Sequence, residues 1–124
     1  MKAKKKFLVI DQGLRNAILK DYELREENVG FVLENVIGVH LLFHRKGRDN
    51  KVFYWKANDE IDFVVTNKEI IPVEVKYKNR IAENDKKSLI HFLKKFKKNK
   101  AILITKTLYG QEKVSSGILH LRFP

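Results

Sequence analysis

The segments Glu60-Ile61-Asp62-Phe63-Val64-Val65-Thr66 and Ile70-Ile71-Pro72-Val73-Glu74-Val75-Lys76 decide how this chain folds. Both are rich in β-branched residues, which favours strands. Only Asn67-Lys68-Glu69 separates them, and a connection this short is typical of a β-hairpin. Both runs are also largely apolar, as expected for strands that are buried in a sheet. The sequence therefore predicts two neighbouring antiparallel strands, both of them buried.

Asp62, Glu74 and Lys76 are charged, although the hairpin around them is largely apolar. Side chains alternate along a strand, so Glu74 and Lys76 share one face. If the connection has three residues, Asp62 pairs directly with Glu74, with Cβ atoms about 5 Å apart. A two-residue turn would instead pair Asp62 with Val73 and move Glu74 to the opposite face.

Two carboxylates this close repel each other unless positive charge lies between them. A hard divalent cation such as Mg²⁺ or Mn²⁺ takes oxygen ligands, and Lys76 can reach into the same site. The alternative is a solvent-exposed hairpin on which a lysine simply neutralises Glu74. Because both strands are predicted to be buried, and buried carboxylates are rare unless paired or metal-bound, the pattern favours a metal site.

A third carboxylate, Glu34, falls within a predicted helix over residues 25–43, whose apolar residues recur at helical spacing. Gly30 and Gly38 lie one turn before and one turn after it. Glycine weakens a helix interior by roughly 1 kcal/mol, so two at this spacing suggest that something approaches the helix closely. The sheet or a nucleic-acid backbone could do so, and ordinary helix–sheet packing with Glu34 at the rim remains open.

The other elements complete an α/β fold with a single mixed β-sheet flanked by helices. A lysine-rich amphipathic helix, capped by Asn84 or Asp85, is expected along 86–100, with lysines on a mostly solvated face. The apolar run 101–105 is expected to be a strand parallel to the Glu74 strand, because a helix connects the two. The remaining expectations are a strand at 7–10, a brief helix at 11–19, a strand at 52–56 turned by Asn58-Asp59, a polar loop at 106–116 and an edge strand at 118–123.

Composition limits the class of protein. At 124 residues the chain is expected to be one domain, spanning 1–124. It contains no cysteine, which excludes disulfides and thiolate zinc sites. No apolar stretch approaches the roughly 20 residues of a membrane span, so we expect no membrane insertion and a cytoplasmic location. His40 and His44 are one helical turn apart, but no obvious third ligand accompanies them, so a transition-metal site there is disfavoured.

The net charge of +11 favours a polyanionic partner. Nucleic acid is preferred to a membrane surface, because the apolar stripe of the lysine-rich helix is needed for the core. No motif for reading particular bases is visible, so contacts with DNA are expected to be mainly to phosphates. The candidate nucleic-acid-binding residues are Arg45, Lys46, Arg48, Lys94, Lys95, Lys97 and Lys98.

The order helix with Glu, strand, strand with Asp, strand with Glu-x-Lys, helix, strand resembles the PD-(D/E)XK nuclease superfamily, an αβββαβ core of the restriction-endonuclease type. More narrowly, the chain resembles the nuclease-like domain at the C-terminal end of many archaeal and bacterial AAA-type ATPases. The matching segments are 7–17, 30–35, 52–56, 60–64, 71–76, 87–89 and 118–124, which together run nearly the whole length.

The resemblance implies roles for four residues. Asp62, Glu74 and Glu34 would bind Mg²⁺ or Mn²⁺, and Lys76 would be the catalytic lysine of a DNA endonuclease like restriction enzymes and Holliday-junction resolvases. A homodimer and an ATPase partner are further expectations from the same resemblance. No glycine-rich loop ending in Gly-Lys-Ser/Thr is present, so the ATPase portion is expected to be absent. The alternative function is a non-catalytic domain that docks nucleic acid or an ATPase partner.

Overall fold

The computed structural model describes residues 26–43, 51–56, 59–66 and 68–122. The predicted strand at 7–10, the brief helix at 11–19 and the turn at Asn58 lie outside the described residues. The described elements in chain order are helix α2 (Glu26–Phe43), strands β1 (Lys51–Lys56), β2 (Glu60–Thr66) and β3 (Ile70–Lys76), the 3-10 helix η1 (Glu83–Lys86), helix α3 (Lys87–Phe96), and strands β4 (Lys100–Thr105), β5 (Gly110–Val114) and β6 (Gly117–Arg122).

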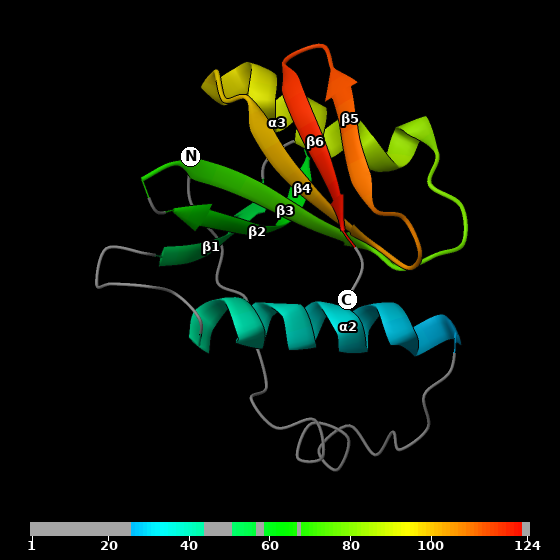
Figure 1. Cartoon of the computed structure of the whole chain (residues 1–124). Coiled ribbons are helices and arrows are strands. Elements are labelled where there is room, and N and C mark those ends of the chain that lie inside the picture. Colours follow the sequence, from blue (N-terminus) through cyan, green and yellow to red (C-terminus); the bar gives the residue numbers. More distant parts are fainter. Residues whose placement is uncertain (1–25, 44–50, 57–58, 67, 123–124) are drawn as a thin grey trace.

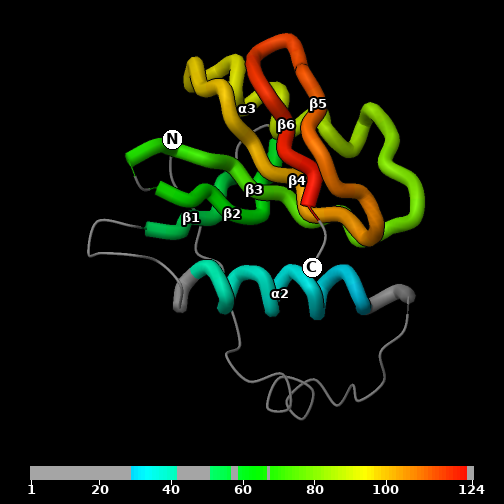
Figure 2. The backbone as a smooth tube through the Cα atoms, viewed as in Figure 1, coloured from blue at the N-terminus to red at the C-terminus, as the bar shows by residue number. Residues whose placement is uncertain are grey.

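The six strands form one mixed sheet in the order β1-β2-β3-β4-β6-β5 (Figure 1). β1, β2 and β3 form an antiparallel meander, and β4 is parallel to both β3 and β6. The chain leaves β3, passes through η1 and α3, and returns as β4 beside β3 (Figure 2). The α/β class, the mixed sheet and the parallel pairing of β3 with β4 are therefore confirmed.

The two long helices lie on opposite sides of the sheet (Figure 1). α3 packs against β2, β3 and β4, and α2 against β1, β2 and β3. The main apolar core lies under α3, where β4 contributes every second residue because alternate side chains share a face. Trp55 of β1 borders this core and packs edge-on against two α3 rings. The cluster consists of Ile61, Val64, Leu89, Phe92, Leu93, Ala101, Leu103 and Leu119.

An irregularity in β2 lies next to the predicted site. Phe53 of β1 pairs with Val64, and Trp55 pairs with Ile61, so one residue of β1 faces two residues of β2. The two residues are Asp62 and Phe63, which makes this a β-bulge. Bulges re-aim side chains, and this one falls on a predicted metal ligand.

The last third of the chain differs from the sequence prediction. The predicted polar loop at 106–116 contains strand β5, which the sequence did not reveal because its polar residues lack an apolar alternation. The final strand, predicted as an edge, lies between β4 and β5, so that β5 is the edge strand. The edge position explains the polar composition of β5, since one of its sides has no strand neighbour.

The lysine-rich helix is shorter than predicted. α3 ends at Phe96, Lys97 adopts the left-handed conformation, and β4 begins at Lys100. No side chain caps the start of α3, so neither Asn84 nor Asp85 has the predicted role. Asp85 instead accepts a hydrogen bond from the Ala82 amide, at 2.7 Å, within the turn that precedes α3.

The prediction that the lysines of this helix are mostly solvated is wrong for Lys86. It is only 7% exposed, and its amine contacts the carboxylates of Glu83, at 3.1 Å, and Glu112, at 2.7 Å. The hydrogen bond with Glu112 is the largest of the effects that raise the pKa of Lys86. Because Glu112 belongs to β5, this ion pair ties the start of α3 to the far edge of the sheet. Among the described helices, none is long and apolar enough to cross a membrane.

Candidate functional site

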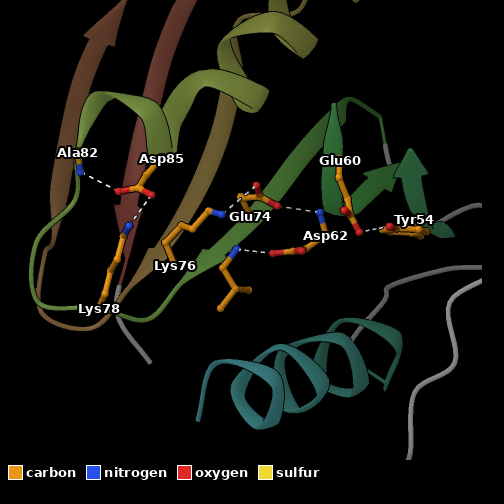
Figure 3. A network of polar contacts seen from close by, with 9 residues as sticks. Tyr54, Glu60, Asp62, Glu74, Lys76, Lys78, Ala82 and Asp85 are labelled. Atoms are coloured by element: carbon orange, nitrogen blue, oxygen red, sulfur yellow. Dashed lines mark hydrogen bonds and ion pairs between the residues drawn. The ribbon is translucent and has the colours of Figure 1, made fainter. Parts of the chain in front are cut away.

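The predicted carboxylates meet where the backbone pairing of β2 with β3 ends. We call this place, between Asp62 of β2 and Glu74 of β3, the fork. Backbone pairing of these strands runs from Thr66 opposite Ile70 to Phe63 opposite Val73. One position further, the amide of Asp62 donates to Oε1 of Glu74 at 2.9 Å. The amide of Val75 donates to Oδ2 of Asp62 at 2.8 Å (Figure 3). Each carboxylate thus binds a backbone amide of the neighbouring strand, and the two acidic side chains fill the fork.

This register confirms the three-residue connection between the strands. Thr66 pairs with Ile70, so Asp62 stands opposite Glu74. The alternative register, with Asp62 opposite Val73, is excluded because Phe63 occupies that place. Of the two registers that the sequence left open, the structure has the one in which the two acidic residues pair.

Glu74 is buried, with 4% of its surface exposed. Leu103, its neighbour in β4, belongs to the apolar core under α3, so Glu74 projects toward the same face. Burial, and then the charge and side-chain hydrogen bond of Asp62, raise the pKa of Glu74 to about 8. The amide of Asp62 and the amine of Lys76 act in the opposite direction but do not outweigh these effects. At neutral pH the acidic pair therefore retains a proton.

Lys76 follows Glu74 on the same face of β3, as the alternation predicted. Its amine lies 4.0 Å from Oε2 of Glu74, and 38% of its side chain is exposed. Lys76 therefore links the buried carboxylate to the surface. A group arriving from solvent would meet the amine before it met Glu74.

Glu34 lies half-buried on α2, which packs against the β1–β3 part of the sheet. Among the described residues, no three His, Cys, Asp or Glu side chains gather closely enough to hold a metal ion. Asp62 and Glu74 are thus a pair, to which Glu34 does not add a third carboxylate in this arrangement. The role of Glu34 as a ligand stays a prediction.

The glycines beside Glu34 differ from each other. A Cβ atom built on Gly30 would meet nothing within 4 Å, so the close approach that the sequence suggested does not occur there in the described structure. Gly38, in contrast, is buried. Among the described residues, none therefore crowds α2 at the Gly30 position beside Glu34.

Sequence reasoning missed the neighbours that surround the pair. The hydroxyl of Tyr54 donates to Oε1 of Glu60 beside the fork (Figure 3). Burial, and then the hydrogen bond and charge of Glu60, raise the pKa of Tyr54 to about 12, with smaller contributions from Asp62 and Glu74. Tyr54 faces the bulge in β2, and because the bulge interrupts the alternation, no simple pattern in the sequence placed this tyrosine there.

A second carboxylate–lysine contact lies on the other side of Lys76. The amine of Lys78 approaches Oδ1 of Asp85 at 2.6 Å. Burial alone would raise the pKa of Asp85, but the hydrogen bonds from Lys78 and from the amide of Ala82 outweigh it and lower the pKa. Asp85 therefore stays ionised beside the fork, whereas Glu74 does not.

The predicted nucleic-acid-binding residues fall in two groups. Arg45, Lys46 and Arg48 lie outside the described residues. The lysines of the second group surround the C-terminal end of α3, where Lys95 lies over the rings of Trp55 and Phe96, with its amine 5.6 and 5.8 Å from the ring centroids. Lys94, Lys97 and Lys98 instead line a cleft beside the turn between β2 and β3.

The comparisons with known proteins support the family part of the narrower resemblance and contain no match to a nuclease. No curated protein and no solved structure matches the chain. A family model, described as a domain of unknown function (DUF4143), matches residues 29–122. This match covers the sheet, α3, α2 from Val29 onward, and the fork with Asp62, Glu74 and Lys76. The chain therefore belongs to the DUF4143 family, a domain found at the C-terminal end of AAA-type ATPase-like proteins.

Proposed function

We propose that this domain is a nuclease of the PD-(D/E)XK type, which hydrolyses phosphodiester bonds in DNA with the aid of Mg²⁺ or Mn²⁺. The observation that supports the proposal most strongly is the fork, where Asp62 and Glu74 face each other at the end of the β2–β3 pairing, with Lys76 beside them. A fold that needed only stability would place apolar residues here, because a buried carboxylate pair is costly.

The donor set suits a hard divalent cation. Both side chains offer carboxylate oxygens, which Mg²⁺ and Mn²⁺ prefer. A carboxylate that accepts one amide hydrogen bond still has other lone pairs, so the contacts with the amides of Asp62 and Val75 are compatible with binding an ion. The proton that Glu74 retains marks a position where positive charge is favourable. Asp62 and Glu74 would hold the ion. Glu34 lies on α2, on the opposite side of the sheet from α3, so it would become a third ligand only if α2 approached the fork.

A bound divalent ion would supply charge neutralisation at the scissile phosphate and a more acidic water. Lys76 would bind a non-bridging phosphate oxygen and stabilise the negative charge that grows there as the phosphorane forms. Its partly exposed amine is free to turn from Glu74 toward a phosphate, since the two atoms are 4.0 Å apart. The amides of Asp62 and Val75 hold the two carboxylates in place, so the site is largely preorganised.

The test is cleavage of a panel of linear, flapped and four-way DNA substrates with Mg²⁺ or Mn²⁺. Asp62→Asn and Glu74→Gln should each abolish cleavage, because each removes a ligand charge while keeping the side-chain volume. DNA binding in the presence of a chelator should survive both changes. It should even tighten, because two carboxylates facing a phosphate repel it when no ion is bound.

Glu83→Gln is the matched control, since it removes a carboxylate of η1 whose side chain is 86% exposed and which lines neither the fork nor the cleft beside the β2–β3 turn. This variant should keep metal-dependent cleavage. If the unmodified protein cleaves none of the substrates and binds neither ion, the proposal fails. The domain would then be one that docks nucleic acid or an ATPase partner without turnover.

A further inference from the structure

A second charged feature lies at the opposite end of β3 from Lys76. It is a cleft of about 630 Å³ between the β2–β3 turn, the C-terminal end of α3 and the start of β4. Strand β3 begins with Ile70 at this cleft and ends with Lys76 at the fork, which places the two features roughly 20 Å apart along the strand. Five lysines line this cleft, namely Lys68, Lys94, Lys97, Lys98 and Lys100. We call it the lysine cleft.

The lysines of the cleft lack compensating charge. Glu69 is the sole acidic residue among the described residues that line it. Within the described part of the chain, none of the five amines forms an ion pair with a carboxylate. Lysines gathered without partners repel one another, so the cleft would be stabilised by a ligand with several negative charges.

The backbone at Lys97 provides an independent observation. Lys97 has φ 53° and terminates α3 in the left-handed conformation, and its amide donates to the carbonyl of Leu93. The amide of Lys98 donates to the same carbonyl at 2.9 Å, which completes a Schellman-type helix end. Glycine normally occupies this position because a Cβ atom is strained there. The chain carries a lysine at the lip of the cleft where stability alone would favour glycine.

We propose that the lysine cleft binds the phosphate backbone of a nucleic acid, at a site separate from the carboxylate fork. Phosphates along a duplex present one negative charge per about 1.7 Å of helix axis, which suits several amines in one cleft. No aromatic residue and no arginine is found among the described residues that line the cleft, although these are the usual anchors of protein partners. Lysines act as point charges, so the cleft should bind phosphates without regard to base sequence.

This inference goes beyond cleavage and does not require it. Binding at the lysine cleft needs no divalent ion, whereas the fork is proposed to act only with one. Measurements in EDTA therefore remove any ion-dependent binding at the fork. Asp62→Asn, which disables the proposed nuclease site, should not weaken duplex binding in EDTA, whereas loss of the cleft lysines should, so the two proposals fail separately.

The decisive variant is Lys97→Gly in the full chain. Glycine relieves the left-handed strain, so the melting temperature should rise by a few degrees. The same change should weaken binding of a fluorescent DNA or RNA duplex in EDTA, followed by anisotropy. If Lys97 had a purely structural role, its replacement by glycine would raise the melting temperature without weakening duplex binding.

The salt dependence gives a second measure. Affinity falls with salt, so the slope of log affinity against log salt is negative. Removing one phosphate-binding amine should make this slope less steep by about 0.9, and Lys94→Gln with Lys98→Gln should make it less steep by about twice that amount. Lys113→Gln removes an exposed lysine from the edge strand β5 and serves as the control with an unchanged slope. An unchanged slope in the double variant would overturn the proposal. So would polyglutamate binding that depends on Lys97 while duplex binding does not, since that result would indicate an acidic protein partner.

Discussion

Glu74 is the residue at which the stability of the fold and the proposed chemistry oppose each other. It is buried in the sheet, faces a second carboxylate, and has its pKa raised to about 8 by burial and then by Asp62. Without a metal ion the protein resolves this conflict by keeping a proton on the pair. Residues that lower stability in this way are common at functional sites, where they are retained for what they bind.

The first prediction is that Glu74 makes the metal-free protein less stable as pH rises. The unfolded chain releases this proton near pH 4.5, whereas the folded chain keeps it until about pH 8. Between these values the folded state binds more protons, so the free energy of unfolding falls with rising pH. Glu74→Gln should abolish this loss and, at pH 8, be more stable than the unmodified protein by on the order of 2–4 kcal/mol.

The measurement is urea unfolding in EDTA at several pH values between 5 and 9. Glu69→Gln, at an exposed carboxylate, should follow the curve of the unmodified protein. Parallel curves for Glu74→Gln and the unmodified protein would mean that Glu74 does not carry the raised pKa.

The second prediction concerns Lys76 and cleavage. Lys76→Ala should slow metal-dependent cleavage on the order of 10²-fold, as expected when one electrostatic stabiliser of a transition state is removed. The decrease should appear in kcat more than in KM, because the amine would act on charge that develops during the reaction. Lys106→Ala, at the residue after β4, is the comparison, and an equal decrease in both variants would indicate a general effect of positive charge.

At the scale of elements, α2 presents an unusual surface. Gly30 lies within the helix, yet a Cβ atom there would meet nothing in the described structure. The third prediction is that Gly30→Ala stabilises the protein by about 0.5–1 kcal/mol, because alanine favours helix and finds room. Thermal unfolding measures this gain. If cleavage or DNA binding falls while stability rises, the open surface beside Glu34 is where the substrate approaches, and unchanged activity would exclude that use.

The sequence could predict those elements whose pattern lies within a short stretch of neighbouring residues. The bounds of strands β2 and β3 were predictable to the residue, because runs of β-branched residues and a short connection are local signals. Their register was left between two alternatives, and the three-residue connection decides it. β5 was missed because an edge strand with polar side chains carries no apolar pattern. The burial of Lys86 depends on Glu112, which lies 26 residues away in a segment predicted to be a loop.

The site itself was partly predictable for the same reason. The pairing of Asp62 with Glu74 and the approach of Lys76 follow from strand geometry, which is local. The bulge at Asp62 and the contact of Tyr54 with Glu60 arise from the way in which β1 pairs with β2, and no local pattern specifies that irregularity. The relation of Glu34 to the fork depends on helix–sheet packing, for which the sequence supplied only a spacing.

At the scale of the whole molecule, a bound ion should change the stability of the entire fold. The fork lies between β2 and β3 at the end of their pairing, and β3 continues the sheet to β4, so unfolding of the domain would disrupt the ion's ligands. A ligand that binds only the folded state stabilises it by mass action. At a concentration 100 times the Kd, the gain is about 2.7 kcal/mol.

The fourth prediction is that Mg²⁺ or Mn²⁺ at such a concentration raises the melting temperature of the unmodified protein by about 10 °C. The shift should vanish in Asp62→Asn and be reversed by EDTA, whereas Glu69→Gln should retain it. Measured by scanning fluorimetry, this experiment requires no knowledge of the substrate. A shift of equal size in Asp62→Asn would place the ion elsewhere, and the fork would then have no part in binding it. A shift that needs Asp62 but occurs without any cleavage would describe a domain that keeps its metal site without turnover.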